Sequence, residues 1–210
     1  MNYNLVKFGT AKLILATSFI VLSSCASRLP TPQGVPEVTI ANYEKAVSEK
    51  TQKIEVYDGL YNKLTVQSTW LDSLLTEYAL SHSARLSQWN EVKYREERSK
   101  KVNKNAESTE FFVSFYAPEK KHADLSSSKT IWKIFLDVNG QRYEGKATKI
   151  KQILSEVQAL YPYHNRWSVP YSVSFPVATS LVEGKPAKLI FTGAVGSAEL
   201  NYNNLTQAAP

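Results

Sequence analysis

The strongest constraint on the fold is a series of short runs in which apolar and polar residues alternate. Alternation of period two places one face of a β-strand in a core and the other in water. Asn139-Gly140 separates two of these runs, and Asn-Gly between alternating runs is the strongest short signal of a β-hairpin. The runs that predict strands lie at 109–116, 130–138, 141–150, 169–175, 186–193 and 197–202.

Strands of this length and spacing predict a mainly β chain of the α+β class, in which residues 108–203 form an antiparallel immunoglobulin-like β-sandwich. A small barrel is the alternative. Because proline cannot donate to a sheet, Pro170 predicts a strand that lies at an edge or begins there. Cys25 is the only cysteine, so an intrachain disulfide is excluded and the disulfide of antibody domains is missing.

A β-hairpin and one long amphipathic helix are expected over residues 51–107, packed on the sandwich. Two strand-like runs flank Asp58-Gly59, a dipeptide suited to a two-residue hairpin turn. Apolar residues then recur at steps of three and four, which is helical spacing, and Thr69 or Asp72 is expected to cap the first turn. This stripe consists of Leu71, Leu75, Tyr78, His82, Leu86, Trp89 and Val92, and His82 is expected to be a packed core histidine.

The end of this helix carries charges of both signs, which predicts a solvated helix end that leads into a loop. The alternative is a basic patch that contacts anionic lipid or polymer, although glutamates nearby dilute its charge. The patch would consist of Arg95, Arg98, Lys100, Lys101 and Lys104.

The first 24 residues have the pattern of an export signal. Lys7 and Lys12 are the only charged residues before Cys25, and the apolar run at 13–22 has ten residues, whereas a membrane-spanning helix needs about 20. Leu22-Ser23-Ser24-Cys25 resembles the lipobox of bacterial lipoproteins, which implies removal of residues 1–24 and attachment of diacylglycerol to Cys25. An ordinary secretory signal with a chance cysteine is the alternative.

Residues 25–50 are then expected to be the lipidated cysteine and a flexible tether, because three prolines and one glycine fall between Ser27 and Val38. Lipid on Cys25 would make the membrane the first partner of the chain and localise it to the cell envelope. Ala26-Ser27 lacks the aspartate of the usual sorting pattern, which implies the outer membrane in a cell with two membranes. Residues 204–210 are expected to be a disordered tail.

The second half also resembles a group of exported bacterial lipoproteins in which a hairpin and a helix precede the strands. The resemblance rests on FFVSFYAP, IWKIFLDVNG, YPYHNRWSVPYSVSFP and KLIFTG, with Glu199 and Leu200 after them. It covers about two thirds of the mature chain but consists of aromatic strand residues and turn residues. It therefore implies a fold and no activity.

Charge and motifs exclude several functions. The formal charge is +6, and loss of Lys7 and Lys12 leaves 23 basic and 19 acidic residues, a mild balance that together with export argues against nucleic acid. The three histidines lie far apart, and HExxH, GxSxG and phosphate-loop patterns are all missing from the sequence. We therefore predict no catalytic residue, metal or cofactor, and a protein that is not an enzyme.

The most suggestive cluster is the aromatic and polar stretch at 161–167, from which the candidate contact residues are Tyr163, His164, Arg166 and Trp167. Aromatic rings beside polar groups suit a sugar or peptide, although the same residues can simply pack the end of the sandwich. The leading hypothesis is a non-catalytic envelope module that contacts another protein, and the alternative is a binder of a small ligand or glycan such as peptidoglycan. A concave pocket that holds the rings of Tyr163 and Trp167 would favour the ligand, a flat exposed patch the protein.

Overall fold

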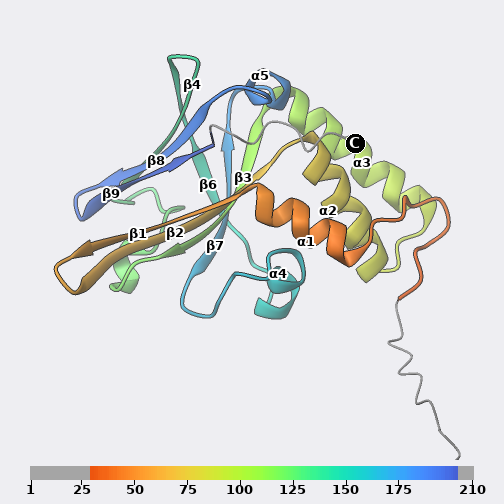
Figure 1. The fold of residues 1–210 in the computed structure, drawn as a ribbon, viewed down its shortest axis with the longest axis horizontal. Helices are drawn as coiled ribbons and strands as arrows, with labels where there is room; N and C mark the ends of the chain where they lie inside the picture. The colour runs from red at the N-terminus through yellow and green to blue at the C-terminus, as the bar shows by residue number, and fades with distance from the viewer. Residues whose placement is uncertain (1–28, 203–210) are drawn as a thin grey trace, which may run out of the picture.

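Two antiparallel sheets and a group of helices make up the computed structural model, which describes residues 29–202 (Figure 1). The expected signal peptide, Cys25 and the tail at 204–210 lie outside the described residues. The first sheet has the strand order β1-β2-β3-β7-β6 and the second β5-β4-β8-β9. The bounds are β1 (Thr51–Asp58), β2 (Tyr61–Leu71), β3 (Thr109–Tyr116), β4 (Trp132–Val138), β5 (Gln141–Glu144), β6 (Lys146–Lys149), β7 (Val169–Phe175), β8 (Ala187–Gly193) and β9 (Gly196–Asn201).

Both predicted hairpins are present. β4 and β5 turn at Asn139 and Gly140, whose φ angles of +50° and +76° suit the left-handed turn that Asn-Gly favours. β1 and β2 are joined by Gly59-Leu60, because Asp58 already pairs with Tyr61, so this turn lies one residue later than Asp58-Gly59 predicts.

The predicted strand at 141–150 is divided between the sheets at Gly145. β5 pairs with β4 in the second sheet, whereas β6 pairs with β7 in the first. A Cβ atom at Gly145 would lie 2.5 Å from Cε1 of Phe175, so the chain crosses between the sheets at a residue without a side chain.

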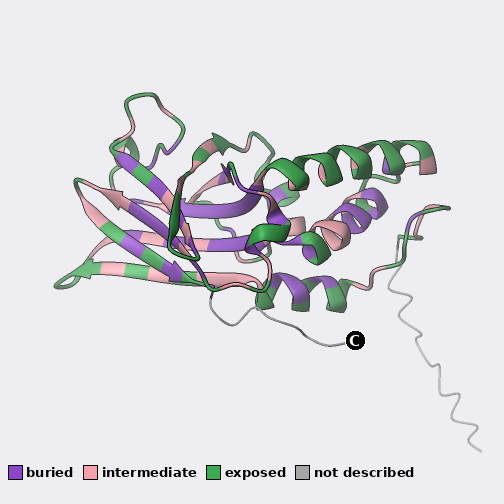
Figure 2. Cartoon of the chain, turned by 90° about the horizontal axis from the view of Figure 1, so that it is seen from above, coloured by how far each residue is buried: buried purple, intermediate pink, exposed green. Residues whose placement is uncertain are grey.

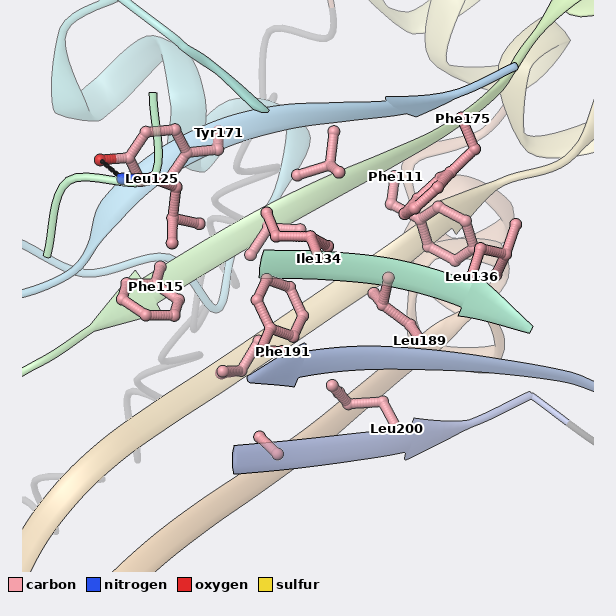
Figure 3. Packing of buried hydrophobic residues seen from close by; sticks show 14 of the residues in the cluster. Phe111, Phe115, Leu125, Ile134, Leu136, Tyr171, Phe175, Leu189, Phe191 and Leu200 are labelled. Atoms are coloured by element: carbon pink, nitrogen blue, oxygen red, sulfur yellow. Dashed lines mark hydrogen bonds between the residues drawn. The ribbon is translucent and has the colours of Figure 1, made fainter. Parts of the chain in front are cut away.

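One hydrophobic core fills the space between the sheets (Figure 3). Phe115 of β3 lies edge-on to Trp132 of β4 at 5.2 Å between ring centroids and contacts Phe191 of β8 at 5.9 Å. The α+β class and the sandwich-like packing of antiparallel sheets are therefore as predicted. The immunoglobulin-like strand order is not confirmed. That order places the first two strands of the sandwich in one sheet, whereas β3 and β4, the first two strands after residue 108, lie in different sheets, and the hairpin β1–β2 is part of the first sheet.

The single long helix is not confirmed either, since α2 (Ser73–Leu86) and α3 (Glu91–Glu107) replace it. Gln88 has a φ of +49°, and the N–H of Trp89 donates to the carbonyl of Ala84 at 2.9 Å. This left-handed residue with its backward hydrogen bond is a Schellman motif, which ends α2 although the apolar spacing continues. Val92, expected on the buried stripe, is 75% exposed.

A helix also occupies the second half of the predicted tether, so the expectation of flexible chain up to residue 50 is wrong for residues 40–49. The side chain of Thr39 caps α1 (Ile40–Glu49), which buries Tyr43 and Val47. The hydroxyl of Tyr43 donates to the carbonyl of Leu160 at 2.9 Å. Proline content predicts extended chain at 27–38, but it carries no information about the amphipathic turns that follow.

The helices gather on one side of the molecule, and their buried faces turn toward one another and the sheet (Figures 1 and 2). His82 is buried as predicted and stacks on Tyr43 with ring centroids 4.3 Å apart. Burial lowers the pKa of His82. The remaining helical elements are η1 (Lys120–His122), α4 (Leu154–Leu160) and α5 (Thr179–Val182).

A buried carboxylate ties α3 to the first sheet. Glu110 of β3 is 6% exposed, forms ion pairs with Lys101 at 3.2 Å and Lys104 at 2.9 Å, and accepts a hydrogen bond from Ser172. Burial by itself would raise the pKa of Glu110, but Lys101, Ser172 and Lys104 outweigh it and lower that pKa to about 2. The charged form of Glu110 is therefore stabilised by folding.

Glu110→Gln should destabilise the protein at pH 7 by on the order of 2–3 kcal/mol, because a lowered pKa contributes stability above the unfolded value near 4.5. That contribution is lost as pH falls toward 2, so the difference in unfolding free energy between the two proteins should shrink. Urea denaturation at pH 7, 4.5 and 3 measures it. Glu96→Gln, which removes an exposed carboxylate paired with Lys100, is the matched control and should change stability little. An equal decrease in the free energy of unfolding at pH 7 and at pH 3 would contradict the lowered pKa of Glu110.

Candidate functional site

The outer face of the first sheet, opposite the core, is only half covered. Phe112 of β3 points outward and stacks on Tyr161, with ring centroids 3.6 Å apart and an angle of 6° between the rings. α1, α2 and the segment around α4 join this outer cluster, so one half of the face is closed. The polar residues of the other half alternate with core residues and face outward.

These polar residues form two rows across the strands. Lys53 of β1 is opposite Gln67 of β2, which is opposite Ser114 of β3. In the next row Glu55 is opposite Thr65, and Thr65 is opposite Tyr116. Neighbouring strands lie about 4.8 Å apart, so each row offers a polar group at that spacing.

A pocket of about 530 Å³ lies over these rows. Its floor consists of the six residues of the two rows, and its wall comes from the segment at 161–168. The wall residues are Tyr163, Asn165, Trp167 and Ser168. The pocket therefore combines three aromatic side chains with hydroxyl, amide and charged groups.

His164 holds the wall against the sheet. Its side chain is 3% exposed, and Nδ1 lies 2.8 Å from Oγ of Ser114. The side-chain amide of Gln158 donates to the carbonyl of His164 at 2.8 Å. Burial lowers the pKa of His164, so the neutral ring is favoured. His164 thus positions the wall and does not line the pocket.

Tyr163 is fixed by a chain of hydroxyl groups. Thr51 donates to the carbonyl of Val47 at 2.6 Å, and its oxygen lies 2.6 Å from that of Thr69. Thr69 must then donate to Thr51 and accept from Tyr163, whose hydroxyl oxygen lies 2.5 Å away, because each hydroxyl has one proton. Burial raises the pKa of Tyr163, which keeps this donor protonated. Because the hydroxyl group of Tyr163 is used in this way, a ligand can contact only the ring of Tyr163.

Trp167 stands at the rim with 74% of its surface exposed. Its backbone N–H donates to the side-chain oxygen of Asn165 at 2.9 Å, which shapes the local turn and leaves the indole ring free of this contact. Arg166 between them is exposed and does not line the pocket. Of the four residues proposed from sequence, Tyr163 and Trp167 lie together in the pocket, His164 lies beneath it and Arg166 lies outside it.

None of the six residues that form the floor of the pocket was predicted from the sequence as a site residue. The signal was present in the alternation of β2, where Thr65 and Gln67 are the polar partners of the core residues Leu64 and Val66. Alternation says that such residues face outward, but it does not say that a segment a hundred residues later closes over them.

The charges in the pocket are paired. Nζ of Lys53 lies 2.5 Å from a carboxylate oxygen of Glu55, and the hydroxyl of Tyr57 donates to the other oxygen at 2.9 Å. Hydrogen bonds from Lys53 and Tyr57 lower the pKa of Glu55, so the carboxylate is ionised at neutral pH. An ionised carboxylate beside an ammonium group suits hydrogen bonding to a ligand better than proton donation.

The basic residues of α3 do not form a free positive surface. Arg98 pairs with Glu77 at 2.9 Å, and Lys101 and Lys104 both pair with Glu110. Arg95 and Lys100 pair with glutamates one turn away. Every member of the basic patch that was the alternative to a solvated helix end therefore has an acidic partner.

Within residues 29–202, no cluster of three or more His, Cys, Asp or Glu side chains is arranged to hold a metal ion. No helix in that range has the length and apolar character needed to cross a membrane.

Comparisons with known protein families, with curated proteins and with solved structures gave no match to the chain.

Proposed function

We propose that this chain is a membrane-anchored, non-catalytic protein of the bacterial cell envelope whose domain binds a small ligand or glycan in the pocket between the outer face of the first sheet and the segment at 161–168. The observation that carries the proposal is that the rings of Tyr163 and Trp167 line one concave pocket together with polar side chains of the sheet. A flat aromatic patch would have favoured a protein partner instead.

The size and the chemistry of the pocket support a ligand of this class. Its volume of about 530 Å³ lies within the range of roughly 300–1,000 Å³ typical of ligand sites. Trp167, Tyr163 and Tyr116 offer flat apolar faces, while Gln67, Asn165 and the hydroxyl groups can orient a polar ligand. Sugar rings have both an apolar face of C–H groups and hydroxyls at the rim.

The anchor rests on the sequence pattern at Cys25. The side chain of Gln88 donates to the carbonyl of Pro30 at 3.1 Å, and Val35 packs with Leu80 and Tyr94, so the free chain between lipid and domain would run from Cys25 to about Leu29. Five residues span at most about 18 Å. The proposal therefore keeps the pocket close to a membrane surface, which is the outer membrane in a cell that has two.

A contact with an envelope protein is the second candidate, and the tip of the β1–β2 hairpin favours it. Leu60 is fully exposed there, and Tyr57 and Tyr61 are each more than half exposed. Exposed apolar side chains gathered at one tip are typical of interaction sites. This contact would leave the pocket free.

Trp167→Ala should weaken glycan binding about tenfold or more, because it removes the most exposed aromatic face of the pocket. A glycan array that includes peptidoglycan fragments identifies a ligand, and titration calorimetry measures the loss. Arg166→Ala is the matched control, since Arg166 is exposed in the same segment but does not line the pocket. Equal effects of the two substitutions, or no binding to any glycan by the folded protein, would overturn the proposed ligand.

Cys25→Ala should abolish labelling by radioactive palmitate and release the protein from the membrane fraction, because a single thiol carries the proposed lipid. Cell fractionation with blotting measures the release. Membrane attachment that persists without label would contradict the lipoprotein assignment.

A photoreactive amino acid in place of Leu60 should crosslink to an envelope protein in living cells if the hairpin tip is a contact. The same amino acid in place of Val92, an exposed apolar residue at the start of α3, is the control and should give no adduct of that mass. Identical adducts from both positions would indicate chance collision and reject the second candidate.

A further inference from the structure

A second pocket of about 470 Å³ lies beside the first on the same outer face. α1 supplies one wall through Glu44, Val47 and Ser48, and Pro162 stands on the other side. Lys53, Gln67 and Tyr163 line both pockets. The three shared residues place the two pockets side by side, and the groove, which means both pockets together, runs from α1 past Tyr163 to Trp167.

We propose that this groove binds a linear, neutral oligosaccharide of more than one sugar unit, with a subsite in each pocket and Tyr163 at their junction. The inference rests on the proposed ligand binding and extends it from a small ligand to a chain. Each pocket alone falls within the volume range of a ligand site, so a single sugar would leave the second one empty.

The junction is rigid. The hydroxyl of Tyr163 is committed to Thr69, and Thr69 leads through Thr51 to the carbonyl of Val47 in α1. The ring therefore sits at a fixed position between the subsites and connects the wall of one pocket to that of the other. A fixed ring binds a sugar face at little cost in side-chain entropy.

The charges favour a neutral chain. Among the residues that line the two pockets, all within the described range, Lys53 is the one Lys or Arg, beside the carboxylates of Glu55 and Glu44. Lys53 is already paired with Glu55 at 2.5 Å, and Glu44 adds negative charge to the second pocket. A chain that carries a carboxylate on each sugar would meet this charge without a free cation to compensate it.

The floor favours a sugar chain over an extended peptide. Gln67 and Ser114 lie on the interior strands β2 and β3, whereas Lys53 lies on β1, the edge strand of the sheet. Peptides that bind as an added strand need an open backbone edge. A strand added at β1 would extend the sheet sideways and would not lie over the floor, which offers side chains. Hydroxyl groups of a sugar need only side-chain donors and acceptors.

The test is a length series on the full chain, purified in a detergent without a sugar head group. Neutral oligomers of glucose, mannose and N-acetylglucosamine with one to five units are titrated by calorimetry, next to oligomers of galacturonic acid. For the neutral series that binds, affinity should rise at least tenfold between one and four units, and the acidic oligomers should bind more weakly.

Ser48→Trp should remove the rise in affinity with oligomer length. Ser48 is an exposed residue of α1 in the second pocket, and the indole ring would fill that pocket. Asn42→Trp is the matched control with no expected effect on the rise, because Asn42 is an exposed residue of α1 that lines neither pocket. Ser48→Gln is a smaller obstruction for use if the tryptophan variant does not fold, as judged by circular dichroism.

The outcomes separate this inference from the one it rests on. Affinity that is independent of length, unaffected by Ser48→Trp but lost in Trp167→Ala would overturn the two-subsite groove and leave the single pocket in place. Stronger binding of the acidic oligomers would overturn the neutral ligand. Binding of none of these series, with extended peptides bound instead, would overturn the oligosaccharide altogether.

Discussion

The stack of Tyr161 on Phe112 is the contact on which the pocket on the outer face of the first sheet depends. β3 is buried on both faces, with Phe111, Val113 and Phe115 in the core between the sheets and Phe112 on the outer face. Rings 3.6 Å apart fix the point at which α4 ends against the sheet. The residues from Pro162 to Ser168 follow this point, run along the same face of the sheet and form the wall of the pocket. An aromatic packing contact thus decides where the wall of the pocket lies.

The sequence predicted the local structure well and the long-range structure partly. Alternation and turn residues located β3, β4 and β7, because period two and Asn-Gly are local properties of the chain. The end of α2 escaped prediction because Gln88, not glycine, takes the left-handed conformation there. The division of residues 141–150 between two sheets depends on the space around Gly145, which Phe175 fills from a distant part of the sequence.

The candidate site was likewise predicted only where local sequence carries the information. Tyr163 and Trp167 stand out in the sequence because aromatic residues cluster there, and they lie together in the pocket. His164 stands out equally, but its burial against Ser114 gives it a positioning role. Lys53, Thr65 and Gln67 look like ordinary outward-facing residues of a hairpin. Their place in the groove follows only from the closure of a segment a hundred residues later over that hairpin, and no local pattern records such a closure.

α1 connects the N-terminal segment to the groove. The chain that enters α1 from residue 39 is the chain that leads back toward the N-terminus, and α1 is also a wall of the groove. Tyr43 bonds to the end of α4, and Val47 bonds through Thr51 and Thr69 to Tyr163. A pull on the N-terminal segment would load the contacts of Val35 with Leu80 and Tyr94 on α2 and α3, and would reach α1 and its wall of the groove only after these contacts gave way. The packing of Val35 therefore shields the wall of the groove from forces on the N-terminal segment.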